Sequence, residues 1–124
     1  MSNLVKNVIE FDTKVYKISG PLGKNMTLKG GEGKIEVGQV LSIDETTGKL
    51  VKYISKKVGE GPEATEALTL ALSEADATSG DTVVLVAVPN TFFNRGEVKG
   101  VELGTDFRCI KELWKSGIIL EEVE

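Results

Sequence analysis

Few side chains in this sequence could carry out bond-making chemistry. Histidine is absent and cysteine occurs once, at Cys109. This composition excludes histidine as a general base, Ser–His and Cys–His nucleophiles, and the usual Cys/His zinc sites. A helix start near Cys109 could lower the pKa of its thiol, but an isolated cysteine is more often a small apolar core residue. We therefore predict that the protein is not an enzyme.

The acidic residues Asp44, Glu45, Asp76 and Asp81 remain as candidates for a calcium site or a carboxylate pair. A calcium loop needs alternating acidic ligands and a terminal glutamate, and no acidic run here has that pattern. Aspartate is frequent in turns, where its side chain accepts backbone hydrogen bonds. We interpret all four as turn residues and solvated charges, and we predict no metal site.

Three glycine-rich stretches resemble nucleotide-binding motifs only in part. Residues 59–64 match the dinucleotide fingerprint in letters, but they include a proline and two glutamates. The proline removes a backbone donor from the phosphate cradle, and the glutamates bring negative charge to it. Residues 20–24 and 30–34 lack the spacing and the Ser or Thr of a P-loop. We therefore expect no cofactor.

The composition is that of one soluble globular domain, with 124 residues, 40% hydrophobic, 27% charged and a net charge of -4. The acidic balance argues against a nucleic-acid partner, because phosphate recognition relies on clustered Lys and Arg. No apolar run approaches the ~20 residues of a membrane helix, and the N-terminus lacks the uncharged core of a secretory signal. We expect no membrane partner and a cytoplasmic product.

The pattern of elements is organised around the stretch from Asp76 to Pro89. Six of the eight residues from Thr82 to Pro89 are Val, Leu or Ala. A short apolar run between turns is typical of a strand buried on both faces. We predict that residues 82–89 form the central strand of the fold.

Two segments before this strand are also predicted to be extended. Residues 38–55 favour a β-hairpin, because Thr47-Gly48 supplies the positive backbone angle of a tight turn. Residues 63–74 are ambiguous, since their alanines and leucines fit both helical spacing and strand alternation. We favour a strand there, because the segment lies between a hairpin and a buried strand.

The clearest helix lies near the C-terminus. Thr105 or Asp106 can cap it, Gly117 provides its stop, and residues 118–120 follow as a short strand. The apolar residues expected on its buried face are Phe107, Ile110, Leu113 and Trp114. The aromatic side chains expected to pack in the core or in an interface, rather than form a stacking platform, are Phe92, Phe93 and Trp114.

The first 34 residues fit neither helical nor strand periodicity. We predict an extended N-terminal arm with two glycine-rich loops over residues 1–34, followed by a β-rich domain over residues 35–124. An arm with many apolar residues must lie against its own domain or a partner. Those apolar residues are Leu4, Val5, Val8, Ile9, Phe11, Val15, Tyr16 and Ile18. The predicted fold is mainly β with a short C-terminal helix (α+β), with a compact barrel-like or sandwich core.

In this order, the features resemble the head decoration proteins of tailed bacteriophages, the lambda-like capsid-stabilising family. The resemblance runs from about Gly38 to Leu120. Its parts are Gly38-Gln39-Val40-Leu41 with the Thr47-Gly48-Lys49 turn, the acidic run 74–81 before the valine-rich strand, Phe93-Asn94-Arg95, and the helix ending from Leu113 to Gly117-Ile118. The chain departs from the family at Leu68-Thr69-Leu70, where members often carry Gly-Ile-Leu, and in the length of its arm.

The resemblance implies a homotrimer that binds the outside of the mature phage head at three-fold or quasi-three-fold positions. There it would stabilise the shell against DNA pressure, with the major capsid protein as its partner and the virion exterior as its location. Trimeric presentation of one arm per chain would add avidity. An extended arm can also add a strand to a neighbouring sheet, so we predict that residues 1–18 bind the coat protein.

Two other classes of binding protein remain open. A biotinyl or lipoyl carrier domain presents its modified lysine at a hairpin tip; Lys49 follows Thr47-Gly48, but without the usual adjacent Met or Asp. Intact mass would reveal the added cofactor. A barrel that binds oligosaccharides or nucleic acids would need a basic or aromatic groove, and retention on DNA at low salt would reveal it.

Overall fold

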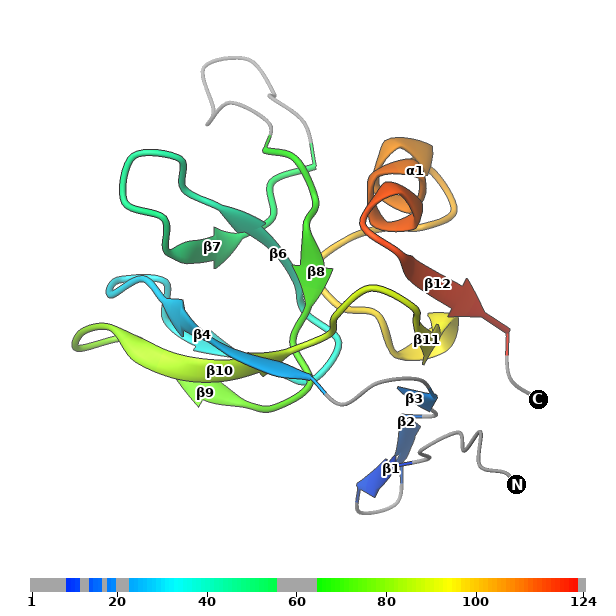
Figure 1. Ribbon diagram of the computed structural model, residues 1–124, viewed down its shortest axis with the longest axis horizontal. Helices are drawn as coiled ribbons and strands as arrows, with labels where there is room; N and C mark the ends of the chain where they lie inside the picture. Colours follow the sequence, from blue (N-terminus) through cyan, green and yellow to red (C-terminus); the bar gives the residue numbers. More distant parts are fainter. Residues whose placement is uncertain (1–8, 12–13, 17, 20–22, 56–64, 123–124) are drawn as a thin grey trace.

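The computed structural model describes residues 9–11, 14–16, 18–19, 23–55 and 65–122. Over these residues the chain is mainly β with one short helix near the C-terminus, which confirms the predicted fold class (Figure 1). The nucleotide-like stretch 59–64 lies outside the described residues.

Five strands form the main sheet, and it curls into a small barrel. They follow the order β10 (Thr82–Val86), β4 (Lys24–Leu28), β7 (Leu50–Lys52), β6 (Val40–Ile43) and β8 (Thr69–Leu70). Only the β4–β7 pair is parallel within this sheet. Just after β8, Ala71 bridges to Val86 on β10, and Ala87 N donates to Leu70 O at 3.0 Å. The last strand of the sheet therefore reaches back to the first.

A second sheet stands beside the barrel and carries the helix. Its order is β12 (Ile118–Glu121), β11 (Thr91–Asn94) and β3 (Ile18–Ser19), with β11 parallel to β12 and antiparallel to β3. Between β11 and β12 the chain forms the 3-10 turn η1 (Arg95–Glu97) and the helix α1 (Phe107–Lys115). The short strands β5 (Lys34–Ile35) and β9 (Ala75–Asp76) pair with each other.

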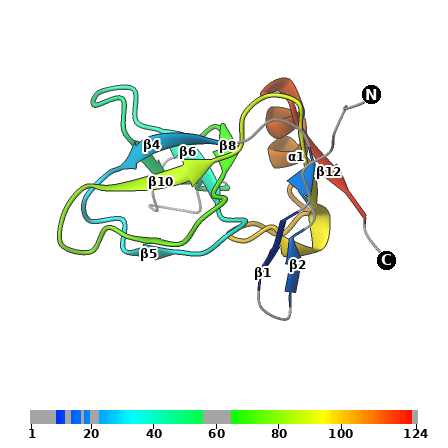
Figure 2. The same ribbon diagram turned by 60° about the horizontal axis from the view of Figure 1, so that its bottom comes forward.

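The N-terminal strands β1 (Ile9–Phe11) and β2 (Lys14–Tyr16) form a separate antiparallel hairpin. Figure 2 shows this hairpin extending away from the barrel, on the side of the second sheet. Between the two predicted glycine-rich loops, residues 24–28 are β4 of the barrel rather than part of an arm.

Two hydrophobic cores lie on opposite faces of β6 and β8. Alternate residues of these strands enter different cores: Val40 and Leu70 face the second sheet and α1, whereas Leu41 and Ala71 face the barrel interior. The barrel core is Leu28, Ile35, Leu41, Leu50, Ala71, Ala77, Val84 and Val86. The outer core is Val37, Val40, Tyr53, Ala67, Leu70, Leu72, Ala87, Phe93, Cys109, Leu113 and Ile118.

The prediction that residues 82–89 form a central strand buried on both faces is wrong. Residues 82–86 form β10, which stands at one end of the sheet order, and Val83 on its outer face is 60% exposed. β6 is instead buried on both faces, since Val40, Leu41 and Ser42 are all buried, and both residues of β8 are buried as well. The apolar run predicted a strand correctly, but no second layer covers its outer face at Val83.

The other predicted β elements are confirmed. β6 and β7 form the hairpin, and Gly48 has the expected positive φ of 73°. Residues 65–74 include β8 and no helix, in agreement with the favoured strand.

Gly38, just before β6, lies close to the backbone of η1, and it should not tolerate a side chain. Its φ is 93°, and an added Cβ would lie 2.0 Å from the backbone oxygen of Glu97. Gly31 has nearly the same φ, 95°, but an added Cβ there would have no atom within 4 Å. A substitution at Gly31 therefore measures the cost of the backbone conformation alone. Gly31→Ala should cost about 1–2 kcal/mol from the left-handed backbone alone. Gly38→Ala should cost about 1–3 kcal/mol more because of the overpacking.

Urea denaturation of the two variants measures this difference in unfolding free energy. Equal losses at Gly38 and Gly31 would contradict the proposed close approach.

Candidate interaction surface

The helix α1 begins and ends as its sequence predicts. Asp106 is the N-cap, and its side chain accepts a hydrogen bond from the backbone N–H of Cys109 at 3.0 Å. The helix ends at Lys115, and Gly117 follows with a φ of 87°. Cys109 and Leu113 are fully buried in the outer core. This complete burial confirms the prediction that Cys109 is an apolar core residue, and burial also raises the pKa of its thiol to about 12.

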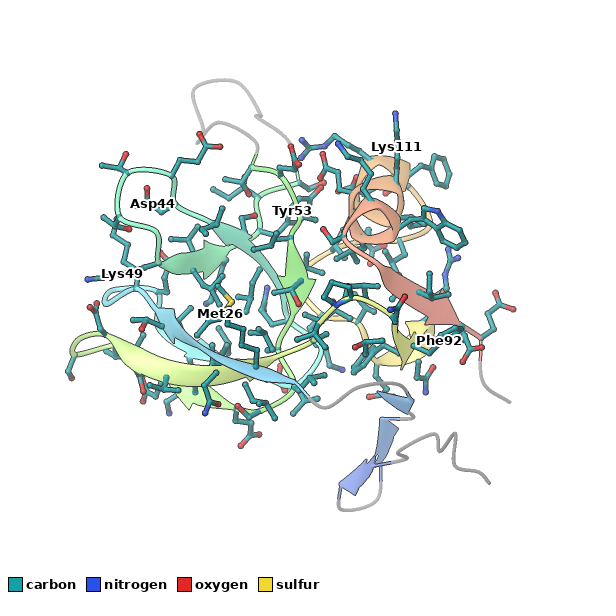
Figure 3. All side chains as sticks on the ribbon, in the orientation of Figure 1. Met26, Asp44, Lys49, Tyr53, Phe92 and Lys111 are labelled. Atoms are coloured by element: carbon teal, nitrogen blue, oxygen red, sulfur yellow. The ribbon has the colours of Figure 1, made fainter. Side chains whose placement is uncertain are left out.

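The predicted buried face of this helix is wrong for two of its aromatic residues. Phe107 is 67% exposed and Trp114 is 66% exposed. Successive helical residues are about 100° apart, so Cys109 and Leu113 face inward and Phe107 and Trp114 face outward. Lys111 lies between these two aromatic residues and points away from the barrel (Figure 3). We name the exposed residues Phe107, Lys111, Trp114 and Lys115 the α1 outer face.

Polar bonds around Asp106 join the start of α1 to the segment that follows β7. Its carboxylate accepts hydrogen bonds from the hydroxyls of Tyr53, at 2.8 Å, and of Ser55. Burial opposes ionisation of Asp106, but these bonds and that from Cys109 N outweigh it and hold its pKa below the usual value. Burial and the bond to Asp106 raise the pKa of the Tyr53 phenol. Tyr53 lies between the barrel and α1 (Figure 3).

Two further side chains of α1 bind the segment before β8. Arg108 donates to the carbonyl oxygens of Ser55 and Thr65, at 2.7 Å and 2.8 Å. Glu112 accepts from the backbone N–H of Ala67 at 2.8 Å and lies 3.4 Å from the Arg108 guanidinium. Because these groups hold the inner side of the helix, the α1 outer face has a fixed orientation.

The pKa of Asp106 predicts a pH-dependent contribution to stability. Since the folded pKa lies below the ordinary value of 3.8, the contribution is present above that pH and is lost as the pH falls through the folded pKa. Asp106→Asn should therefore lower stability at neutral pH and flatten the acid dependence.

Urea denaturation from about pH 7 to about pH 3 tests this, with the exposed Glu74→Gln as control. An Asp106→Asn variant with the wild-type acid slope would contradict it.

Asp44 and Asp76 act as turn residues, in agreement with their interpretation from the sequence. Asp44 and Asp76 accept hydrogen bonds from the backbone N–H groups of Thr46 and Thr78, both at 2.9 Å. Bonds from the backbone of Thr46 and the hydroxyl of Thr78 lower the pKa values of their aspartates. In the described part of the chain, no group of three or more His, Cys, Asp or Glu could hold a metal ion.

Asp81 makes longer-range contacts across the barrel. It accepts from the backbone N–H of Gly30 at 2.8 Å and pairs with the Lys49 ammonium, and these bonds, chiefly the one from Lys49, lower its pKa.

The predicted arm residues fall on several short strands. Ile9 and Phe11 belong to β1, Val15 and Tyr16 to β2, and Ile18 to β3. Leu4, Val5 and Val8 lie outside the described residues. β3 pairs with β11, where Ile18 is opposite Phe93.

The aromatic residues expected in the core or an interface have three different environments. Phe93 is fully buried in the outer core, and Phe92 beside it is half-buried. Trp114 is not a core residue, so only its interface role remains as a prediction.

A pocket that the sequence analysis missed lies beside the β6–β7 turn. It has a volume of about 300 Å³ and is lined by Ile43, Glu45, Thr65, Glu66, Ala67 and Leu68. Ile43 is 40% exposed, which is unusual for a residue at the end of an otherwise buried strand. We name this the acidic pocket, because its two charged residues, Glu45 and Glu66, are both exposed carboxylates. No sequence motif marks it, since its two segments meet only in the folded chain.

The described residues thus define a small β-barrel domain with an exposed aromatic and basic helix face. Comparison with known protein families finds none that matches the chain, and no curated protein is significantly similar to it. Within the described ranges, none of the helical segments has the length and apolar character required to span a membrane.

The inner and outer residues of α1 should differ sharply in their effect on stability. Leu113→Ala removes a fully buried side chain and should cost about 2–5 kcal/mol. Trp114→Ala removes an exposed one and should change the unfolding free energy by no more than about 0.5 kcal/mol. Urea denaturation of both variants at low protein concentration checks this, and a Trp114→Ala loss as large as that of Leu113→Ala would contradict the assignment of the two faces.

Proposed function

We propose that this protein is a capsid decoration protein, which binds the outside of a mature phage head as a homotrimer and stabilises the shell against DNA pressure. The resemblance from Gly38 to Leu120 supports this assignment. The order of elements along that stretch, a β-rich body followed by one short helix and a final strand, agrees with the fold predicted from the sequence.

The observation that carries the proposal is the arrangement of the N-terminal strands. In the described part of the chain, β1 and β2 pair only with each other, and they extend away from the body (Figures 1 and 2). An isolated two-stranded hairpin is marginally stable in water, and its edges carry backbone groups that can pair with another strand. A coat-protein sheet would supply those hydrogen bonds by strand addition.

The next strand links the arm to the body. β3 pairs with β11, whose Phe93 is fully buried in the outer core. Because β3 belongs to the second sheet, the arm is connected to the packed body at its C-terminal end. Force on a bound arm would therefore act on the second sheet. Three such arms in one trimer would bind with high effective concentration once the first is attached.

Removal of residues 1–16 should abolish binding to expanded capsids and leave the body folded. This deletion takes away β1 and β2 but retains β3 and its pairing with β11. Cosedimentation with expanded shells of the coat protein encoded in the same genome measures binding, and light scattering measures assembly. The matched control carries the same 16 residues in scrambled order.

Undiminished binding by the deletion variant would refute the role of the arm. Absence of shell binding by the intact protein would refute the decoration function itself.

The alternative of a biotinyl or lipoyl carrier domain has less support. Lys49 follows the β6–β7 turn, but its ammonium pairs with Asp81 rather than standing free at a hairpin tip. An intact mass equal to that of the unmodified chain, after expression with the ligase and its cofactor, would exclude this alternative.

A further inference from the structure

We propose that the α1 outer face of one chain docks into the acidic pocket of a second copy of the same chain. This proposal rests on the homotrimer of the proposed function and identifies the surfaces that would form it. The two surfaces are Phe107, Lys111, Trp114 and Lys115 on α1, and Ile43, Glu45, Glu66 and Leu68 at the pocket.

The α1 outer face has the composition of an interface centre. Phe107 and Trp114 are two of the four large apolar side chains that are markedly exposed in the described part of the chain, and they lie two helical turns apart on one face. Aromatic residues are enriched at interface centres, and tryptophan is the most frequent residue type at binding hot spots. The polar ties of Arg108 and Glu112 fix the helix, so little ordering would accompany docking.

The charges of the two surfaces are opposite. Lys111 and Lys115 are exposed on α1, whereas Arg108 is already engaged with Glu112 and with backbone carbonyl groups. The pocket is lined by Glu45 and Glu66 together with Ile43, which is 40% exposed. An aromatic side chain flanked by lysines therefore meets an apolar floor flanked by carboxylates, and such complementarity fixes register and rejects other partners.

The size of the pocket also fits one large side chain. Its volume of about 300 Å³ is at the lower end of the range of about 300–1,000 Å³ for small-molecule pockets. The chain as a whole is acidic, with a net charge of -4, so a basic face on α1 is a local exception that favours an acidic partner surface such as this one.

Both surfaces belong to each chain, and the proposed contact joins the α1 outer face of one copy to the acidic pocket of the next. Within one chain, Arg108 and Glu112 of α1 bind Thr65 and Ala67 of the pocket lining, whereas Phe107 and Trp114 are exposed on the outer face. The acidic pocket is lined by the end of β6, the turn that follows it and the segment before β8. Contact between different surfaces of identical chains is heterologous, and it gives a closed ring when the rotation between subunits closes. A ring of three is the form that the proposed homotrimer requires.

Zero-length crosslinking of a mixture of unlabelled and isotope-labelled chains tests the contact directly. The carbodiimide joins a lysine to a carboxylate only when the two are in contact, and mixed-isotope peptides identify links between different chains. We expect mixed-isotope links from Lys111 or Lys115 to Glu45 or Glu66, both in concentrated protein and on expanded shells. Links within one chain only, or no links at these residues under either condition, would overturn the proposal.

Substitutions then test the energetics by sedimentation over a protein concentration series. Trp114→Ala should weaken association by at least about 30-fold, as hot-spot tryptophans do. Val83→Ala, which truncates another exposed apolar side chain on β10, is the matched control and should leave association unchanged. Reversal of both lysines to glutamate, or of both pocket glutamates to lysine, should disrupt association, and both reversals in one chain should restore it.

The outcomes distinguish failure of this contact from failure of the decoration function. Wild-type trimers that persist in the Trp114→Ala and charge-reversed variants would overturn the contact, while shell binding by those trimers would leave the decoration function intact. Mixed-isotope links in a protein that never binds shells would support the contact and refute the decoration function. Occupation of the α1 outer face by another macromolecule would appear as loss of these links when that partner is added, and would overturn the proposal.

Discussion

The structure depends on a pair of strands whose residues alternate between two cores. Because successive side chains of a strand point to opposite faces, Val40 and Leu41 on β6 enter different cores, and Leu70 and Ala71 do the same at β8. One face closes the barrel and the other supports the second sheet and α1. A shift of register by one residue would exchange both faces at once, so the barrel and the helical layer depend on the same pairing.

The packing of α1 on the outer core determines which of its side chains are exposed. Cys109 and Leu113 bind α1 to the outer core, and the polar ties of Asp106, Arg108 and Glu112 hold it against the segments flanking residues 56–64. These contacts use the inner side of the helix. The apolar residues on the other side, Phe107 and Trp114, then have no place in the chain's own core. Large exposed apolar groups of this kind commonly mark association surfaces.

The chemistry of the described side chains agrees with a role in association. The aspartates in turns accept hydrogen bonds from nearby residues, Asp81 pairs with Lys49, and burial raises the pKa of the Cys109 thiol. Three surface features of the described residues stand out: the hairpin of β1 and β2, which pair only with each other there, the α1 outer face and the acidic pocket. A protein that stabilises a shell by covering and joining its subunits would use surfaces of these kinds.

The sequence by itself determined the features that local chemistry controls. The turn at Gly48, the cap at Asp106 and the stop at Gly117 follow from backbone preferences and short-range hydrogen bonds, and all three were predictable. Only the tertiary structure decided which faces are covered. The apolar pattern of residues 82–86 favours a strand, but whether a second layer covers Val83 depends on segments distant in sequence. For the same reason, helical spacing identified the apolar residues of α1 but did not show that the body would pack on Cys109 and Leu113 and leave Trp114 in solvent.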